Sequence, residues 1–240
     1  MNLYEAAARQ YDKTDIDFLA VYFSGKFDCS YLNEENRTLF ELSSSAFDTA
    51  LHAWLSELPI EREIDAFGKK VLAAAQIAAS AKEKRGAAER AAQDRGDPNT
   101  LVVLNAAGKV LHEVHRMMGL LRFSPDSNGE FIARFAPDHF ILPALAEFFA
   151  ARFGETPWSI IDEKRGLCLR RISAENPKIT VLNEKICESQ NLTVSANGDE
   201  WENLWKHYHQ TINNEERNNP GLQRQLMPKR YWKYLPEKSM

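Results

Sequence analysis

The chain has 240 residues, of which 44% are hydrophobic, and a formal net charge of −4 at pH 7. This length can bury one sizeable core or two small ones. A membrane-spanning helix needs about 18 or more consecutive apolar residues; no such run occurs, and the N-terminal MNLYEAAARQYDKTD is too charged for a signal peptide. We therefore expect a cytoplasmic protein. Its cysteines, Cys29, Cys168 and Cys187, are too widely spaced to predict a disulfide framework or a CxxC metal site.

Charge is distributed unevenly along the chain. Residues 1–65 carry 13 acidic and five basic side chains, whereas residues 217–238 carry six basic side chains and one acidic one, Glu237. A chain with an acidic start and a basic end can offer a local anion site despite its negative total. The alternative is a solvated surface with two differently charged faces.

The N-terminal region, residues 1–97, is predicted to be mostly helical from residue 45. Before that point, the apolar runs 18–23 and 38–42 favour strands joined by loops. From Ser45 to Pro59 apolar residues recur at helical spacing, and the predicted inward side chains are Phe47, Ala50, Leu51, Trp54, Leu55 and Leu58. A second helix should start near Ile60, with Ile64, Phe67, Val71 and Ala74 inward. Beyond Ala78 the large apolar residues stop, which predicts an exposed helix that frays at Gly86 and ends before Asp97.

Residues 98–240 are predicted to form an α+β core, and one domain with a helical extension is the economical interpretation of the whole chain. The core should begin with a helix over 98–118, with Asp97 as its cap and Pro98 as its first residue. The predicted apolar face contains Leu104, Ala107, Leu111, Val114 and Met118. Lys109, His112, His115 and Arg116 fall on the opposite face, where they are either solvated or directed at an anion.

Two antiparallel hairpins are predicted to form the sheet of this core. Residues 120–124 and 130–135 alternate in period two around the turn-forming run Asp126-Ser-Asn-Gly129. Residues 157–162 and 166–172 alternate around a second turn in the same way. A helix over 139–153, with Asp138 as its cap, should pack on the sheet together with the 98–118 helix. Its broad apolar face contains Ile141, Leu142, Leu145, Phe148, Phe149 and Phe153.

The C-terminal part is predicted to contain one more helix and an arm. The helix should begin near Asp199 with Trp201, Leu204, Trp205, Tyr208 and Ile212 inward, while residues 173–198 allow no assignment. The run NNPGLQRQLMPKRYWKYLPE then alternates aromatic and basic residues. Single strands or flipped bases stack on such interleaved side chains. A C-terminal arm whose aromatic residues dock on its own sheet while Lys and Arg stems extend to solvent has the same pattern, and we favour the docked arm.

Five separated motifs carry a family resemblance. They are EVHRMMGLLRF at 113–123, the segment 137–143, WSIID at 158–162 with Lys164-Arg165, LWKHY at 204–208, and the run 216–237. In this order they resemble, over roughly residues 44–237, a bacterial domain of unknown function associated with DNA metabolism or DNA repair. The resemblance implies a radical SAM protein encoded nearby and, in some chains, fusion to a uracil-DNA-glycosylase domain. This chain ends three residues after Glu237, so we expect any uracil excision to come from another polypeptide.

Histidine and cysteine patterns give little support to metal or cofactor chemistry. His112 and His115 could supply two zinc ligands, but no Cys pair or HExxH spacing completes a site, so no metal is predicted. No clustered cysteines for an iron–sulfur cluster and no Gly-rich phosphate loop occur in the sequence, so no cofactor is expected and this chain itself is not expected to be a radical SAM enzyme. His115 could form an acid–base group with Asp138 and His139, because His titrates near neutrality and a carboxylate can orient it. The alternative is that Asp138 caps a helix that His139 begins.

Two functional hypotheses follow. The resemblance favours an accessory DNA-repair component that binds DNA and works with a radical SAM partner. Its nucleic-acid-binding candidates are Lys109, Arg116, Arg122, Arg224, Lys229, Arg230, Tyr231 and Trp232. The alternative is an enzyme acting on a nucleobase or phosphodiester, with His115, Asp138 and His139 as its catalytic residues. The oligomeric state is left open.

Overall fold

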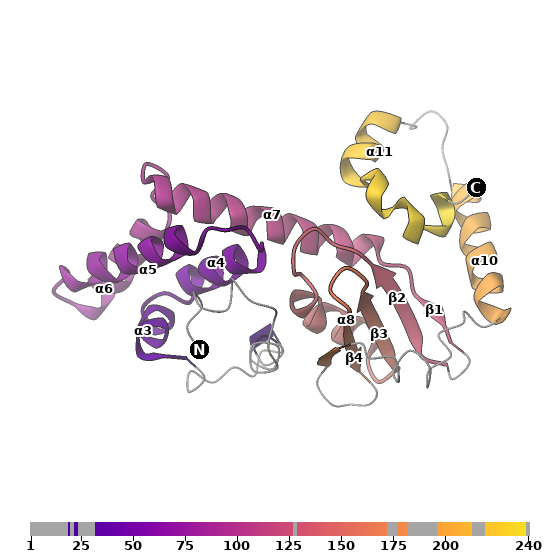
Figure 1. Cartoon of the computed structure of the whole chain (residues 1–240), viewed down its shortest axis with the longest axis horizontal. Coiled ribbons are helices and arrows are strands. Elements are labelled where there is room, and N and C mark those ends of the chain that lie inside the picture. The colour runs from indigo at the N-terminus through magenta and orange to yellow at the C-terminus, as the bar shows by residue number, and fades with distance from the viewer. Residues whose placement is uncertain are drawn as a thin grey trace. The chain divides into compact units, whose positions relative to one another are not determined.

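A computed structural model describes residues 19, 22–23, 32–126, 129–171, 177–181, 196–212 and 219–238. The chain divides into two compact units. Met1–Glu113 and Asp138–Ile141 form the helical unit, and Val114–Pro137 and Leu142–Met240 form the sheet unit. The boundary falls inside the helix α7, Pro98–Leu120 (Figure 1). The architecture is α+β, as predicted.

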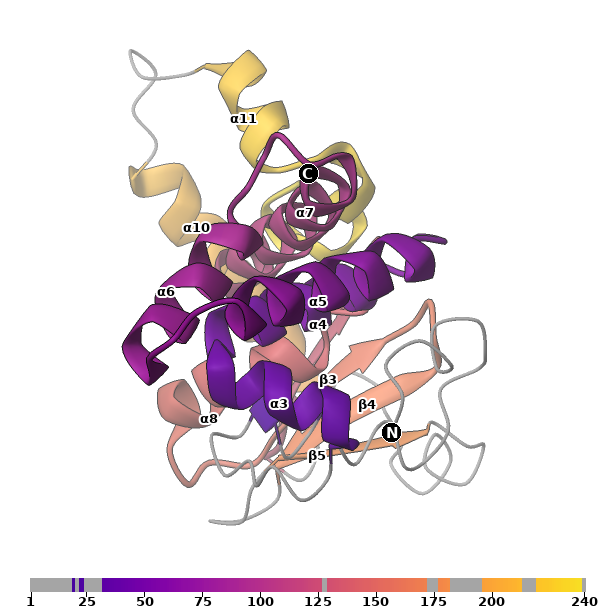
Figure 2. The ribbon, with the colours of Figure 1, turned by 90° about the vertical axis from the view of Figure 1, so that its left-hand side faces the viewer.

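The helical unit is built from α3, Glu34–Leu42, α4, Ser44–Leu55, α5, Glu61–Gln76, and α6, Ala81–Ala92, together with the first part of α7 (Figure 2). Its core confirms the apolar stripe predicted from Ser45 onward, except that Leu58 is 37% exposed. Its fully buried side chains include Phe47, Leu51, Ala53, Leu55, Phe67 and Val71. Within the described residues, no helix combines the length and the apolar character needed to cross a bilayer.

Three predictions for the helical unit are wrong. The run 18–23 is predicted to be a strand, but its described residues, Leu19, Tyr22 and Phe23, are helical. Residues 38–42 belong to α3 rather than to a strand, because the Asn33 side chain caps that helix by accepting the Asn36 N–H at 2.9 Å. The helix α6 does not fray at Gly86. Ser80 and Glu83 form a capping box at its start, and buried alanines such as Ala88 secure its second half.

The helix α7 begins as predicted but buries a slightly different face. The Asp97 carboxylate accepts the backbone N–H of Thr100 at 2.8 Å, which confirms Asp97 as the cap. Leu111, predicted to be buried, is 47% exposed. The buried stripe is Val103, Ala106, Ala107, Val110, Val114 and Met117. This stripe neighbours the predicted one on the helix, and apolar spacing alone does not decide which edge of a broad stripe faces the core.

The sheet of the described residues has the strand order β1-β2-β3-β4-β5. Its strands are β1, Ser124–Pro125, β2, Phe131–Phe135, β3, Trp158–Asp162, β4, Leu167–Arg171, and β5, Lys178–Val181. β1 pairs with β2 and β3 with β4, both antiparallel, which confirms the pairing of both predicted hairpins. The first strand is shorter than the predicted 120–124, because α7 continues to Leu120 and β1 contains only Ser124–Pro125. The hairpins join through parallel pairing of β2 with β3. Parallel neighbours need a crossover, which here contains the 3₁₀ turn η2, Pro143–Leu145, and α8, Ala146–Phe153.

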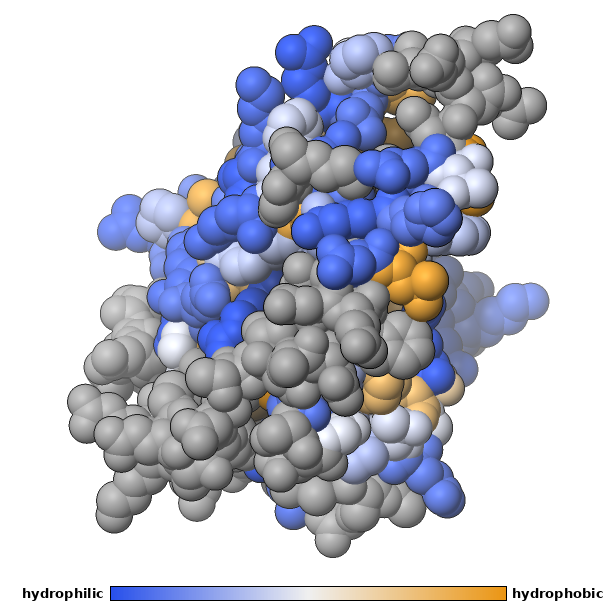
Figure 3. Space-filling view, turned by 90° about the vertical axis from the view of Figure 1, so that its right-hand side faces the viewer, coloured by the Kyte–Doolittle hydropathy of each residue, from blue (hydrophilic) through white to orange (hydrophobic). Residues whose placement is uncertain are grey.

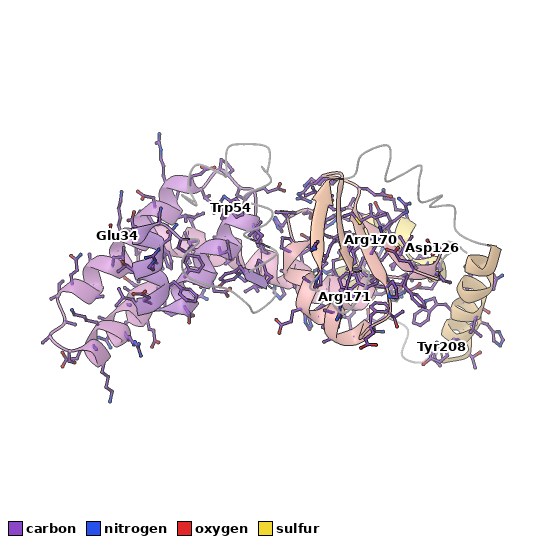
Figure 4. All side chains as sticks on the ribbon, turned by 90° about the horizontal axis from the view of Figure 1, so that it is seen from below. Glu34, Trp54, Asp126, Arg170, Arg171 and Tyr208 are labelled. Atoms are coloured by element: carbon purple, nitrogen blue, oxygen red, sulfur yellow. The ribbon has the colours of Figure 1, made fainter. Side chains whose placement is uncertain are left out.

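Successive residues of each strand face opposite sides of the sheet. α8 covers the side that carries Trp158, whose ring lies 6.2 Å from that of Phe149. On the same side Arg171 donates to the Ala150 carbonyl of α8 at 2.9 Å. The neighbouring Arg170 leaves β4 on the other side, and Figure 4 marks both arginines.

The predicted helix over 139–153 starts later, at Ala146, and Asp138 does not cap it. Instead, the backbone N–H groups of Asp138 and His139 donate to the buried Glu113 carboxylate, each at 2.9 Å, within the helical unit. The chain first forms the 3₁₀ turn η2, in which Pro143 occupies the first position, and α8 follows directly. Residues 140–142 are fully buried nonetheless.

The helix α10, Ala196–Ile212, forms where a helix was predicted but exposes most of the side chains expected inside. Leu204, Tyr208 and Ile212 are 58%, 52% and 58% exposed. The Trp201 side chain lies outside the described residues, and Trp205 is half-buried. In Figure 3, which views the molecule from the side where α10 lies in Figure 1, the described residues are mostly hydrophilic, with hydrophobic patches among them.

The buried phenylalanine of α8 gives a test of this packing. Phe149 is 1% exposed and its ring lies 5.1 Å from that of Phe123, whereas Phe148 is half-buried. Phe149→Ala should lower the free energy of unfolding by ~3–5 kcal/mol, because it removes buried apolar surface and leaves a cavity. Phe148→Ala should cost clearly less. Denaturant unfolding followed by near-UV circular dichroism measures both, and equal losses would show that α8 is rotated.

Candidate nucleic-acid interface

The last described residues form an anchored C-terminal segment, defined as residues 229–238. After α11, Pro220–Leu226, it consists of two 3₁₀ helices, η4, Lys229–Tyr234, and η5, Pro236–Lys238 (yellow in Figure 1). Tyr231 and Leu235 are each 1% exposed, and η4 contacts β2. The prediction of an arm docked on its own sheet is therefore confirmed.

Most cations of the C-terminal segment point outward. Lys229, Arg230 and Lys233 are all exposed. The Arg230 guanidinium lies 4.6 Å from the centre of the Tyr231 ring, and the Lys233 ammonium 4.5 Å from that of Tyr234. Because the segment's own cations lie over its aromatic rings, they compete with bases for those ring faces. The positive charge remains at the surface, where it can meet an anion.

An ion pair between buried Glu237 and half-buried Arg122 holds this segment to the residues that follow α7. The Arg122 guanidinium donates to the Glu237 carboxylate at 2.6 Å and to the Gly119 carbonyl at 2.7 Å. Trp205 Nε1 donates to the other Glu237 oxygen at 2.9 Å, and the Arg122 guanidinium lies 4.8 Å from the centre of the Trp205 ring. Burial alone would raise the pKa of Glu237, but the hydrogen bonds and charge of Arg122 and the bond from Trp205 outweigh it and hold the pKa below its usual value. We call these three side chains the Glu237 clasp.

A second acidic residue, Glu163, lies beside the segment in the turn between β3 and β4. It accepts the Tyr234 hydroxyl at 2.6 Å and lies 3.7 Å from the Lys233 ammonium and 3.8 Å from the Arg134 guanidinium. Burial and the bond to Glu163 raise the pKa of Tyr234. Lys229 and Arg230 are both exposed at the start of the segment. The positive charge of the segment that reaches the surface is therefore found at its start as well as at Lys233.

The remaining predicted nucleic-acid-binding residues are dispersed. Lys109 is exposed on the helical-unit part of α7, and Arg116 is half-buried on the sheet-unit part. Arg224 is exposed on α11, with its Nε bonded to the Pro220 carbonyl at 3.1 Å. Lys229, Arg230, Tyr231 and Trp232 share the C-terminal segment, and Arg122 joins it through Glu237. Of these, Tyr231 is buried, and the Arg122 guanidinium is bound to Glu237 and to the Gly119 carbonyl.

The predicted acid–base residues have structural partners. His139 Nδ1–H donates a hydrogen bond to the Ser56 carbonyl at 3.0 Å, and the Glu113 carboxylate accepts the backbone N–H groups of both Asp138 and His139. These contacts belong to the helical unit, whereas His115 is exposed on the sheet-unit part of α7. Their catalytic assignment stays a prediction. Within the described residues, no three metal-ligating side chains gather as a cation site.

The sequence did not predict a polar network on the side of the sheet opposite α8. Arg170 binds both oxygens of Glu130, through Nε at 2.9 Å and Nη2 at 2.5 Å, and the Ser159 hydroxyl donates to the same carboxylate. Burial raises the pKa of the neighbouring Cys168 thiol to about 11, so this cysteine is protonated at neutral pH and unsuited to act as a nucleophile. The alternation of the strand predicts which side Arg170 faces, but not its partner.

An aromatic pocket of about 410 Å³ lies next to the Glu237 clasp, entirely within the sheet unit. Two of its lining residues, Arg122 and Trp205, belong to the clasp. The others include Phe123, Phe131, Phe149, Arg152 and Phe153. Four of the five lining aromatic residues are half-buried rather than enclosed. The sequence predicts that some of these rings lie in the core but not that they surround a hollow, because they come from β2, α8, α10 and the connection that contains Phe123.

Comparison with known proteins gives a family but no function. A family model described as a domain of unknown function, DUF4130, matches residues 73–237. No curated protein and no solved structure matches the chain.

The Glu237 clasp makes stability depend on pH in a defined direction. The folded-state pKa of Glu237 lies below its usual value of 4.5, so its stabilisation is present above that value and is lost as pH falls through the folded pKa. At pH 7, Glu237→Gln should lower the free energy of unfolding by about 2 kcal/mol, because the charge-assisted bond between buried Glu237 and half-buried Arg122 is lost. Denaturation at pH 7 and pH 3 measures the difference from the wild-type chain. This difference should shrink at the lower pH.

The exposed Glu155, changed to Gln, is the matched control and should match the wild type at both pH values. A Glu237→Gln deficit that does not change between pH 7 and pH 3 would contradict the assigned charge state.

Proposed function

The chain belongs to this family of unknown function, and we propose that it is a nucleic-acid-binding component of DNA repair or DNA metabolism. The supporting observation is the C-terminal segment, which exposes Lys229 and Arg230 on a backbone anchored by Tyr231 and Leu235. A chain of net charge −4 repels DNA on average, so binding requires a local concentration of positive charge. This segment supplies such a concentration.

The anchored backbone favours binding because less conformational entropy is lost when the cations meet phosphates. The segment's cations lie over its own rings, which favours phosphate contacts over base stacking. Phosphate contacts position a protein on nucleic acid but do not distinguish sequences. We therefore propose binding that is sensitive to salt and largely independent of sequence.

The resemblance supports the rest of the proposal. The five motifs resemble a family associated with DNA repair and encoded beside a radical SAM protein, and on that basis we propose a radical SAM protein as the partner. The present chain would then be the accessory, DNA-binding component. An enzyme using His115, Asp138 and His139 is less supported, because the contacts of His139 with Ser56 and Glu113 give it a structural role.

Fluorescence anisotropy tests the proposal with single-stranded and duplex oligonucleotides. Binding should be tightest at ~50 mM salt and weaken steeply as salt rises. The double variant Lys229→Ala/Arg230→Ala should reduce the slope of log K against log salt by roughly 1.4 for a single strand, about 0.7 for each lost phosphate contact.

The matched control is Lys84→Ala/Arg85→Ala, which removes an adjacent, exposed Lys-Arg pair from α6. It should leave the slope unchanged. The proposal fails if the wild-type chain binds neither oligonucleotide at ~50 mM salt, where electrostatic binding is strongest. Equal effects of the two double variants would show that total charge matters and the C-terminal segment does not.

A further inference from the structure

The lining of the aromatic pocket indicates the shape of its ligand. The rings of Phe123 and Phe153 lie 4.7 Å apart, and those of Phe131 and Phe153 5.6 Å apart, so the hairpin and α8 supply one continuous aromatic wall. Trp205 of α10 adds a further ring. Rings that remain half-exposed around a hollow provide faces on which a planar group can stack. The volume of about 410 Å³ lies within the range of small-molecule sites.

The charges at the pocket indicate an anionic group on that ligand. Arg122 and Arg152 both line it, without a lining carboxylate. The Arg122 guanidinium is bound to Glu237 and to the Gly119 carbonyl. Arg152 is exposed in the last turn of α8 and makes no hydrogen bond or ion pair within the described part of the chain. Its five donors are therefore available to an anion.

We propose that this pocket binds one nucleotide, with the base among the aromatic rings and the phosphate at Arg152. The pocket itself supports a planar ring that carries an anion, and the choice of a nucleotide among such molecules rests on the proposed function. The Ser124 hydroxyl, which also lines the pocket, supplies a polar group for the edge of a base. This pocket does not include the exposed cations of the C-terminal segment. It would bind the base and phosphate of one nucleotide, whereas the C-terminal segment would bind several phosphates of a strand.

Calorimetric titration tests the site with three probes: deoxythymidine 5′-monophosphate, thymidine and ribose 5-phosphate. The monophosphate should bind more tightly than either of the other two, because it alone supplies both the ring and the anion. Binding of the monophosphate should also quench the fluorescence of Trp205. In Trp205→Phe, the quenching that comes from this residue should be absent. Arg152→Ala should weaken the monophosphate about tenfold, the effect of losing one charge-assisted contact, and leave thymidine unchanged.

Arg95→Ala is the matched control, because Arg95 is exposed and lies in the helical unit. It should bind all three probes as the wild type does. The proposal is overturned if the monophosphate produces neither heat nor quenching, or if Arg152→Ala and Arg95→Ala bind it equally well. Monophosphate binding without oligonucleotide binding would support the pocket and refute the proposed function, whereas oligonucleotide binding without monophosphate binding would do the reverse.

Discussion

The candidate interface depends on the ion pair between half-buried Arg122 and buried Glu237. Such a pair contributes little net stability when desolvation is counted, but removing Arg122 leaves the Glu237 charge buried without its ion-pair partner. Glu237 also accepts the Trp205 indole N–H, and Arg122 also binds a carbonyl in the last turn of α7. The contacts among Arg122, Trp205 and Glu237 therefore hold the C-terminal segment in one position.

This constraint separates the arginines into two groups. Arg122, Arg165 and Arg170 are paired with the buried carboxylates of Glu237, Asp162 and Glu130, and they define the fold of the sheet unit. Other arginines of the sheet unit, among them Arg152 and Arg230, are exposed. The first group fixes the positions of the elements, and the exposed arginines carry positive charge at the surface. The clasp also supplies two residues that line the aromatic pocket, so one set of contacts shapes both proposed sites.

The contacts also explain several motifs behind the family resemblance. Glu113 and Arg122 belong to the first motif; Glu113 binds the backbone of the second, and Arg122 pairs with Glu237 of the fifth. Trp205 of the fourth motif meets the same Glu237. In the third, Asp162 accepts the backbone N–H groups of Lys164 and Arg165, which forms the turn between β3 and β4. Motifs far apart in the sequence are thus joined by hydrogen bonds that maintain the fold.

Local signals in the sequence predicted the α+β class, the Asp97 cap, the α4 stripe and both hairpins, because each depends on spacing within a few residues. Long-range partners were not predictable in the same way. Arg122 and Glu237 are 115 residues apart, and neither residue type indicates its partner. The prediction that Leu204 and Tyr208 of α10 are buried was wrong for a related reason. Their apolar spacing does not show whether another element covers them. The aromatic pocket is lined by residues from several elements that lie far apart in the sequence, so it could be recognised only in the folded structure.

Hydrogen–deuterium exchange of the wild-type chain, with and without a single-stranded oligonucleotide at ~50 mM salt, tests the central claim most directly, because it locates bound nucleic acid on the chain. The account predicts slower exchange in peptides that cover residues 229–238 and in those that cover residues 119–123, which the Glu237 clasp joins to them. Slower exchange confined to other parts of the chain, with these two regions unchanged, would contradict it.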